Sequence, residues 1–450
     1  MTKVKLSVFL FRRDLRLFDN VGLINACSRS HEVMPLFIFD SAQRNHDYFS
    51  SNAFEFMVNS LKELKHDLKS KGSDLFVLEG DPIEVLKSLK EDIDFDGLFF
   101  NKDYTPFSLK RDKALEDFCS SNNIYCESFH DCLLNPPGSV LNGTGEFYKV
   151  FSAFKREAIK KEIANPKNLD FSNFFNSNIP QVVLDSFVAR SNPDLFLKGG
   201  REEGLSLLGD ILKKEDYDIN RNFVFVDATS KLSAHLKFGT LSVREVYWFF
   251  RDNFFFGHSL ISQLYWRDFF THVAFFNPNV FGLAFREKYN EIKWWGSASN
   301  LEAWKRGETG FPLVDAGMRQ LNKTGWMHGR TRMLVGSFLV KNLGIDWREG
   351  EKYFAQKLID YDPCVNNGNW QWVASTGCDA QPFFRVFNPL IQQKKFDYDC
   401  VYIKTWVLEL KNFSASEIHN FLSSPLENYP EPIVDFKESS ERAKKEFRQI

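Results

Sequence analysis

Hydrophobic residues in the first 130 positions gather in short continuous runs that alternate with amphipathic stretches. The apolar runs lie at 5–11, 33–40, 74–80, 95–101 and 123–129, and each has the length of a buried strand. Helical spacing of apolar residues lies between them, at 51–71, 82–90 and 108–121. This alternation predicts a parallel, doubly wound α/β sheet. No GxGxxG sequence follows the first run, so the fingerprint of dinucleotide-binding sheets is absent.

The hydrophobic pattern changes to helical periodicity from about residue 201 onward. LSVREVYWFF, LISQLYWRDFF and GRTRMLVGSFLVKNL carry apolar residues at three- and four-residue spacing, which predicts an all-α region. Residues 133–200 are irregular and rich in Asn, Pro and Ser, so we interpret them as a connector with short helices. The charged stretch 437–450 is expected to be a solvated or frayed tail. We therefore expect an α/β domain at 1–132, a connector at 133–200 and a helical domain at 201–450.

Composition narrows the class of protein. The 450 residues are 43% hydrophobic and 26% charged, as in ordinary globular proteins, and the net charge is −2. No global basic field favours nucleic acid, although a local basic patch stays open. The seven cysteines form no CxxC pair, which favours a reduced intracellular protein, and the histidines lack metal-ligand spacing. The run SVFLF is followed at once by RRDLR, so we expect neither signal peptide nor membrane span.

Tryptophan is confined to the helical region. All ten tryptophans lie between Trp248 and Trp406, and two of them, Trp370 and Trp372, stand among neutral amides in VNNGNWQWVASTGCD. This clustering has two interpretations. Large helical domains often pack tryptophan in their cores. A helical domain built around a flat aromatic ligand would also contain many tryptophans, because indole stacks well on such rings.

Three further motifs are each weak alone. DATSKLSAHLKFG has hydroxyl residues at a predicted helix start, which suit a diphosphate or an ordinary helix cap. QLYWRDFF places a glutamine, a tryptophan and an arginine on adjoining turns of one helix, or simply forms an amphipathic helix. GWMHGRTRM offers arginines beside Trp and Met, which could line a cavity or form a solvated basic face.

Taken in order, these motifs resemble the photolyase/cryptochrome family of blue-light flavoproteins, most closely the class I cyclobutane pyrimidine dimer photolyases. The resemblance runs from FRRDLRLFDN to about Leu410 and is densest in TSKLSAHLKFGTLS, TGWMHGRTRM, DWREGEKYFAQKLIDYDP and VNNGNWQWVASTGCDAQPFFRVFNP. It implies an N-terminal α/β domain, a helical domain that holds FAD, and a light-driven lyase that repairs UV-damaged DNA as a monomer. It also implies a cytoplasmic location, or a nuclear one in a eukaryote.

The resemblance implies a cofactor site for reduced, anionic FAD. Asn366 matches the asparagine that faces flavin N5, where a neutral amide avoids opposing negative charge on the flavin. Arg332 is expected to pair with Asp360 near the ring. The matching cofactor-binding residues are Tyr217, Thr229, Ser230, Lys231, Leu232, Ser233, Arg332, Asp360, Asp362 and Asn366.

The resemblance further implies substrate-binding and electron-transfer residues. Trp266 and Trp326 match aromatic walls around a flipped-out lesion, with Met333 beside it and Gln263 as its polar contact. Arg221, Arg330, Arg385 and Lys395 match residues that hold the DNA backbone. Trp370, Trp347 and Trp294 match a tryptophan chain that carries electrons from the surface to the flavin.

Four positions depart from the patterns of well-known family members. Gln263 replaces a glutamate, and Gly329 replaces an asparagine that reaches the lesion. The (6-4) photolyases carry a glutamine at the position of Gln263. They also need a pair of histidines, and this chain has only His328, which is followed by Gly329. These departures keep two alternatives open: a (6-4) photolyase, and a cryptochrome that signals without repair. Ser108 and Leu109 replace the residue pair of folate-binding members, so a deazaflavin antenna, a flavin antenna or no antenna is favoured over folate.

Overall fold

The computed structural model describes residues 3–168, 170–187, 191–214 and 216–450, so four residues of the predicted connector, 169 and 188–190, lie outside the described residues. Contacts divide the chain into two compact units. Unit 1 comprises Met1–Ser191, Leu197–Leu212 and Ser230–Pro278, and unit 2 comprises Asn192–Phe196, Lys213–Thr229 and Asn279–Ile450. The division at residues 132 and 200 stays a prediction. No helix among the described residues is long and apolar enough to cross a membrane.

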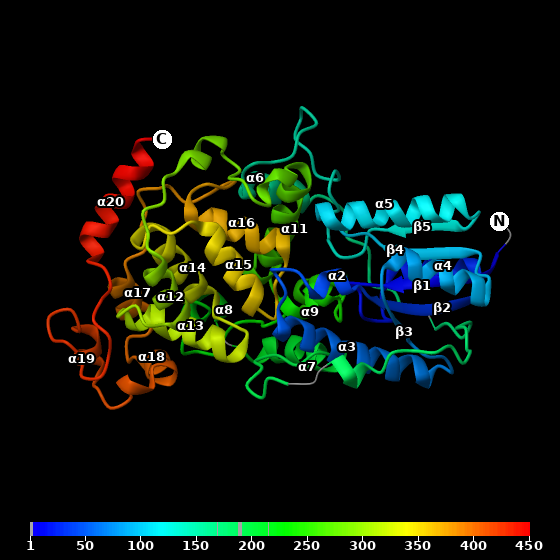
Figure 1. The fold of residues 1–450 in the computed structure, drawn as a ribbon, viewed down its shortest axis with the longest axis horizontal. Coiled ribbons are helices and arrows are strands. Elements are labelled where there is room, and N and C mark those ends of the chain that lie inside the picture. The colour runs from blue at the N-terminus through cyan, green and yellow to red at the C-terminus, as the bar shows by residue number, and fades with distance from the viewer. Residues whose placement is uncertain (1–2, 169, 188–190, 215) are drawn as a thin grey trace. The chain divides into compact units, whose positions relative to one another are not determined.

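Unit 1 contains a five-stranded parallel sheet with the order β3-β2-β1-β4-β5 (Figure 1). The predicted doubly wound α/β fold is therefore confirmed. The strands are β1 Val4–Phe11, β2 Ser30–Phe39, β3 Phe76–Glu79, β4 Gly97–Asn101 and β5 Tyr125–Phe129. The helices of unit 1 are α1 Val21–Arg29, α2 Ser41–Arg44, α3 Ser51–Ser70, α4 Pro82–Ile93, α5 Pro106–Ser121, α6 Phe151–Ala158, α7 Arg201–Asp210, α9 Ser233–Phe238, α10 Val243–Asn253 and α11 Ser259–Phe276.

Local sequence explains where the sheet's helices begin. Ser50, Asp81 and Thr105 each accept a hydrogen bond from a backbone N–H of the helix that follows, and α4 and α5 have proline in their first turn. The apolar runs supply the buried strands, with Val8 and Phe99 fully enclosed. Helix α1 is absent from the sequence prediction, because its nine residues follow a charged loop and carry only a short apolar face.

A buried ion network holds the carboxyl edge of this sheet to helix α10. Asp131 pairs with Arg16 at 2.7 Å and with Arg244 at 2.8 Å, and Arg244 also pairs with Asp19 at 2.9 Å. Burial opposes ionisation of Asp131, but the two guanidinium groups hold the pKa of its carboxyl below the ordinary value. Removing one member would leave buried charge uncompensated, which is costly, so the network fixes this edge firmly.

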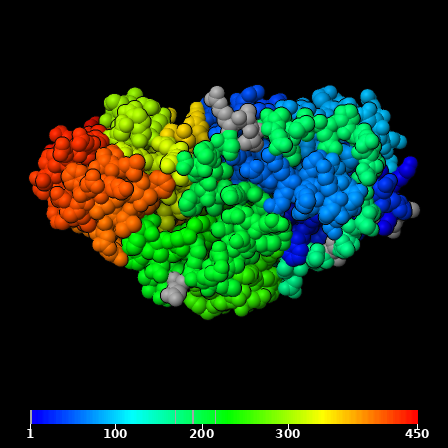
Figure 2. Space-filling view, turned by 90° about the horizontal axis from the view of Figure 1, so that it is seen from below, coloured from blue at the N-terminus to red at the C-terminus, as the bar shows by residue number. Residues whose placement is uncertain are grey.

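Unit 2 is helical, as expected, and packs around one large apolar core. Its helices are α8 Tyr217–Asn220, α12 Ala298–Arg306, α13 Pro312–Thr324, α14 Gly329–Ser337, the π-helical turn η5 Phe338–Asn342, α15 Trp347–Lys357, α16 Pro363–Ala374, α17 Pro389–Phe396, α18 Val401–Trp406, α19 Ala415–His419 and α20 Phe436–Arg448. Figure 2 shows the stretch around α17 and α18 (orange) at the surface. The core includes Trp304, Trp347 and Trp370, so part of the tryptophan content does serve packing.

The charged C-terminal stretch is an ordered helix, so the expectation of a solvated or frayed tail is wrong. Helix α20 buries Ser439, Ser440, Ala443 and Phe447. These positions recur at helical spacing on one face, while lysine and glutamate occupy the other. Ser439 and Ser440 both accept a hydrogen bond from Asn342 of η5 (3.0 and 3.1 Å), which fastens the helix to the core.

Candidate functional site

The start of α16 places a neutral amide beside a buried carboxylate. Asp362 caps this helix by accepting from the N–H groups of Cys364 and Val365, at 3.1 and 3.3 Å. Asn366 follows in the first turn, and its amide nitrogen donates to the backbone oxygen and the Oε1 of Glu351 (3.1 and 3.2 Å). Because its N–H groups face Glu351, the side-chain oxygen of Asn366 is the group able to accept from a ligand. Glu351 carries no role in the sequence analysis, since it stands outside the matched asparagine motif.

The expected pairing of Arg332 with Asp360 is present. Two nitrogen atoms of the guanidinium reach the two carboxylate oxygens at 3.2 and 3.0 Å, and the Nε donates to the oxygen of Met327 at 2.8 Å. The Asp360 side chain is buried at 4% exposure while that of Arg332 is 26% exposed, so the cation keeps an accessible face. Met333, the next residue of α14, is half-buried.

Two predicted DNA-contacting arginines lie close together in unit 2. Arg330 donates to Asn222 and stacks over Phe396, with 4.2 Å from the guanidinium carbon to the ring centroid. Burial, together with the nearby positive charge of Arg221, lowers the pKa of Arg330. The Nε atoms of Arg221 and Arg330 are buried without a hydrogen-bond partner among the described residues. A buried donor without a protein acceptor can be satisfied by a water or by a ligand oxygen.

The two other predicted DNA-contacting cations are exposed. Lys395, on α17, lies 5.3 Å from the ring of Phe396, the same ring that Arg330 covers. Arg385 lies in the loop between α16 and α17 and donates to Gln381 at 3.1 Å. All four cations therefore belong to unit 2, and Phe396 links Arg330 with Lys395.

The three tryptophans of the expected electron chain differ in exposure. Trp370 and Trp347 are 3% and 1% exposed, whereas Trp294 is half-buried. Trp370 contacts Phe354 edge-on at 4.9 Å and Trp304 at 6.3 Å between ring centroids. The indole N–H of Trp347 is buried without a hydrogen-bond partner among the described residues. The sequence analysis gave Trp304 no role, although its contact puts it next to Trp370.

The remaining predicted residues of unit 2 lie in varied surroundings. Trp326 is 6% exposed and stacks on Phe196 with ring centroids 4.2 Å apart, which covers one face of its indole. Tyr217, at the start of α8, is buried. Thr229 is half-buried and its backbone oxygen accepts from Lys214 at 2.7 Å. The roles of these residues stay predictions.

Unit 1 contains the predicted lesion contacts Gln263 and Trp266, both on α11. Gln263 is exposed. Trp266 is half-buried and stacks on Phe151, with ring centroids 3.5 Å apart and planes 9° apart. Phe151 lies in EFYKVFSAFK, one of the motifs that resemble the family, and only its contact with Trp266 in the structure indicates a role for it.

The segment at 230–233, also in unit 1, has a backbone suited to an anion. Lys231 has a φ of 57°, in the left-handed region, and Leu232 follows in the right-handed region with a φ of −82°. Consecutive residues of opposite hand turn their N–H groups toward one concavity, as in phosphate-binding loops. Helix α9 begins at Ser233, and no side chain caps its first turn.

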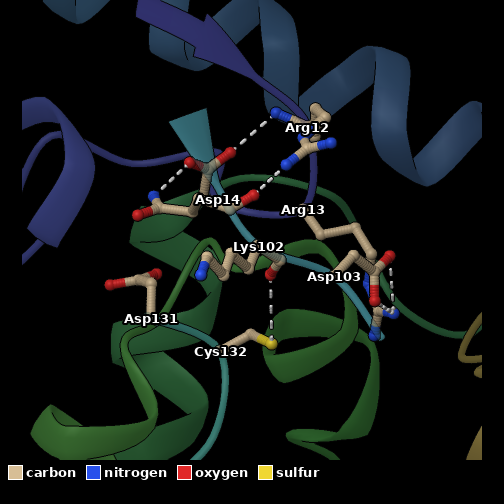
Figure 3. Close-up of a pocket in the computed structure, with 8 residues that line it drawn as sticks. Arg12, Arg13, Asp14, Lys102, Asp103, Asp131 and Cys132 are labelled. Atoms are coloured by element: carbon tan, nitrogen blue, oxygen red, sulfur yellow. Dashed lines mark hydrogen bonds and ion pairs between the residues drawn. The ribbon is translucent and has the colours of Figure 1, made fainter. Parts of the chain in front are cut away.

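A small hollow lies at the carboxyl edge of the sheet (Figure 3). Its lining comes from the segments that follow β1, β4 and β5, namely Arg12, Arg13, Asp14, Asn101, Lys102, Asp103, Asp131 and Cys132. The order β3-β2-β1-β4-β5 reverses direction between β1 and β4, and ligands of such sheets bind outside the carboxyl ends at that point. Arg13 pairs with Asp103 at 3.0 Å, while the Nε of Arg12 is buried without a partner among the described residues.

Among the described residues, no group of three or more His, Cys, Asp or Glu side chains could hold a metal ion, and none of the seven cysteines forms a disulfide. Burial raises the pKa of Cys27 and Cys132 to about 12, so these thiols are poor nucleophiles at neutral pH.

Comparisons with known proteins identify the family of this chain. The family described as the FAD binding domain of DNA photolyase matches residues 260–449, and the family described as DNA photolyase matches residues 7–169. The deoxyribodipyrimidine photo-lyase of Halobacterium salinarum is 36% identical over 478 residues, covering 97% of this chain and 98% of its own.

Two solved structures resemble the fold over nearly its whole length. An archaeal photolyase from Sulfolobus tokodaii, described with two FAD molecules, has a TM-score of 0.92 at 42% identity and covers 99% of this chain and 100% of its own. A bacterial class III photolyase from Agrobacterium tumefaciens has a TM-score of 0.91 at 31% identity, with 100% and 98% covered. The chain therefore belongs to the photolyase/cryptochrome family.

Proposed function

We propose that this chain is a light-dependent lyase that splits cyclobutane pyrimidine dimers in UV-damaged DNA, with reduced, anionic FAD as its electron donor. The observation that carries the proposal is Asn366, a neutral amide held by Glu351 with its oxygen open to a ligand. Family membership and relatives named deoxyribodipyrimidine photo-lyase support the same reaction. We further propose that it acts as a monomer, in the cytoplasm or in the nucleus of a eukaryote.

The residues present fit FAD. The backbone concavity at Lys231–Leu232 suits a diphosphate, and Thr229, Ser230 and Ser233 add hydroxyl groups beside it. The buried aromatic ring of Tyr217 would pack against the chain that links flavin to diphosphate. Asp362 and the Arg332–Asp360 pair supply carboxylates and one cation to the ring systems. This donor set offers hydrogen-bond acceptors, donors and a balancing charge, as a dinucleotide with a redox-active ring requires.

The chain's own groups set the charge at the flavin site. The oxygen of Asn366 would accept a hydrogen bond from N5–H without adding negative charge, and Arg332 would balance charge on the ring. When bound and reduced, FAD supplies the light-driven electron that opens the cyclobutane ring and is then returned. Glu351 orients the amide, so its carboxylate acts on the flavin through Asn366 rather than directly.

Substrate binding is assigned to the cations and aromatic residues. Arg221 and Arg330 have buried donors that lack an acceptor, and a phosphate oxygen would satisfy them. Together with Arg385 and Lys395 they would hold the DNA backbone without reading sequence. Trp266, Trp326 and Met333 would enclose the flipped dimer, and Gln263 would donate its amide to the pyrimidine.

The alternatives are less favoured. A (6-4) photolyase needs two histidines at the lesion. Here His328 is buried and its neighbour is Gly329, and burial lowers the pKa of His328 to about 4, which keeps it neutral. A cryptochrome without repair activity would still use the flavin and the tryptophan chain. The named relatives and both solved structures above are photolyases, so repair is the better supported function.

The decisive experiment is a repair assay on the full chain. Photoreduced protein, mixed with a dimer-containing oligonucleotide and exposed to blue light, should restore the thymine absorbance within the exposure, while a dark sample should not. Protein that contains reduced FAD and binds the oligonucleotide but restores no thymine would exclude dimer repair. An oligonucleotide with a (6-4) lesion, repaired in place of the dimer, would favour that alternative.

The substitution Asn366→Asp tests the neutral amide. A carboxylate at this position would oppose negative charge on the ring and would also lie beside the Glu351 carboxylate. We expect the repair yield per photon to fall roughly tenfold or more, because the added negative charge opposes the anionic flavin. Asn369→Asp is the matched control, because Asn369 lies on the exposed face of the same helix. Equal yields for the two variants would remove Asn366 from the flavin site.

The substitution Trp347→Phe tests the electron chain. Trp370 would give an electron to the photoexcited oxidised cofactor. The oxidised indole would then be reduced by Trp347, and Trp347 by the half-buried Trp294, which can release its proton to solvent. Replacing Trp347 should abolish rapid photoreduction while chemically reduced enzyme repairs normally. Trp406→Phe serves as a control that leaves the chain intact. Photoreduction at the normal rate in the Trp347 variant would show that the electron takes another route, such as Trp304.

We further propose a second flavin as antenna at the carboxyl edge of the sheet. The support is the substitution of Ser108 and Leu109 at the folate positions, and the Sulfolobus tokodaii relative described with two FAD molecules. Flavin released by unfolding should number two per chain. Lys102→Glu, in the hollow, should lower this count to one, and Lys110→Glu, on the exposed face of α5, should not. One flavin per chain in the unmodified protein would exclude the antenna.

A further inference from the structure

Lys341 is a buried lysine in the π-helical turn η5. It is 1% exposed, and its Nζ donates to the backbone oxygen of Arg385 at 2.9 Å. Its neighbours in the turn, Phe338, Leu339 and Val340, are fully buried apolar residues. π-turns are rare and are frequent at functional sites. A lysine at such a position is expected to have a specific partner, because burying an ammonium group without one is costly.

The surroundings of Lys341 explain its contact. Burial, and then the positive charge of Arg385, lower the pKa of its ammonium to about 7. Helix α20 packs against the same turn, but it presents the hydroxyl groups of Ser439 and Ser440 to the neighbouring Asn342. Among the described residues the carbonyl of Arg385 is thus the hydrogen-bond acceptor of Lys341, and the guanidinium of Arg385 is the charge that acts on it.

The loop that carries Arg385 is held at two points on one continuous helix. The backbone N–H of Phe387 donates to the hydroxyl of Ser337, at the end of α14, at 3.4 Å. Lys341 holds the carbonyl of Arg385 one turn further along. The Arg385 side chain itself is exposed and donates to Gln381. The same helix carries Arg330 and Arg332 at its other end, so it joins the flavin site to the loop within unit 2.

We propose that Lys341 is a positioning residue that fixes the backbone of the loop at Arg385 so that the Arg385 guanidinium is presented to the DNA backbone. The proposal rests on the proposed function, which assigns Arg385 to DNA. The substitution Lys341→Met separates this role from simple packing. Methionine has a similar length and needs no desolvation of charge, so the protein should keep its stability or gain some. A packing role predicts that the loop is then unaffected, whereas the positioning role predicts that the loop loses its attachment.

Hydrogen exchange tests the hold on the loop without reference to DNA. In Lys341→Met, amides in a peptide covering 381–388 should exchange about tenfold faster, as the loss of one charge-assisted hydrogen bond allows. Lys411→Met, a substitution of an exposed lysine in unit 2, should leave that peptide unchanged. Unaltered exchange at 381–388 in a folded, FAD-containing Lys341→Met protein would overturn the proposal.

Binding of a dimer-containing oligonucleotide tests the consequence. We expect Lys341→Met and Arg385→Ala each to weaken binding about tenfold, and the double variant to bind no more weakly than Arg385→Ala alone, because both changes remove one contact. Faster exchange with unchanged affinity, or fully additive effects, would overturn the positioning role. Failure of the unmodified protein to bind the oligonucleotide would instead reject the proposed function, and the exchange result would still decide whether Lys341 holds the loop.

Discussion

The cap at the start of α16 is the interaction on which the proposed flavin site depends. Asp362 accepts the first free N–H groups of the helix, and Pro363 at the first helical position fixes the chain direction. This places Asn366 one turn inside the helix and Asp360 just before it, where Arg332 pairs with it. Loss of the cap would shift both groups together, because a helix start moves as a unit. A site that must hold a neutral amide within hydrogen-bond reach of one ring atom needs this rigidity.

Buried charge is used in two ways in this protein. In unit 1, Asp131, Arg16 and Arg244 compensate one another, and their network serves to fix the carboxyl edge of the sheet. In unit 2, Arg221 and Arg330 keep buried donors without acceptors, and Lys341 is held by a single carbonyl. The compensated network acts as scaffolding, whereas a buried donor without a protein acceptor, as also found at Arg12 in unit 1, can be satisfied by a water or by a ligand oxygen.

Tryptophan shows why one residue type cannot be given one meaning. Trp304 and Trp347 are both fully enclosed in the same core, yet the indole N–H of Trp304 donates to the oxygen of Val335 while that of Trp347 has no partner among the described residues. Trp326 is covered on one face by Phe196, and Trp266 by Phe151. Packing and electron transfer are compatible, because a buried indole carries no net charge and needs only contact with the next donor.

The sequence alone determined the order of the elements and the chemistry of the strongest motifs. Continuous apolar runs and helical spacing are local properties, so the parallel sheet and the helical region could be predicted from the residues themselves. The pair Arg332–Asp360 was expected from the family resemblance. Tertiary structure decided what depends on distant contacts. Glu351 contacts Asn366, which lies fifteen positions further along the chain. Lys341 of η5 contacts Arg385 in the loop between α16 and α17. The charged C-terminal stretch forms α20 because the core offers an apolar surface to one face of that helix. Such contacts leave no periodic signal in the sequence, because only the fold decides which distant residues meet.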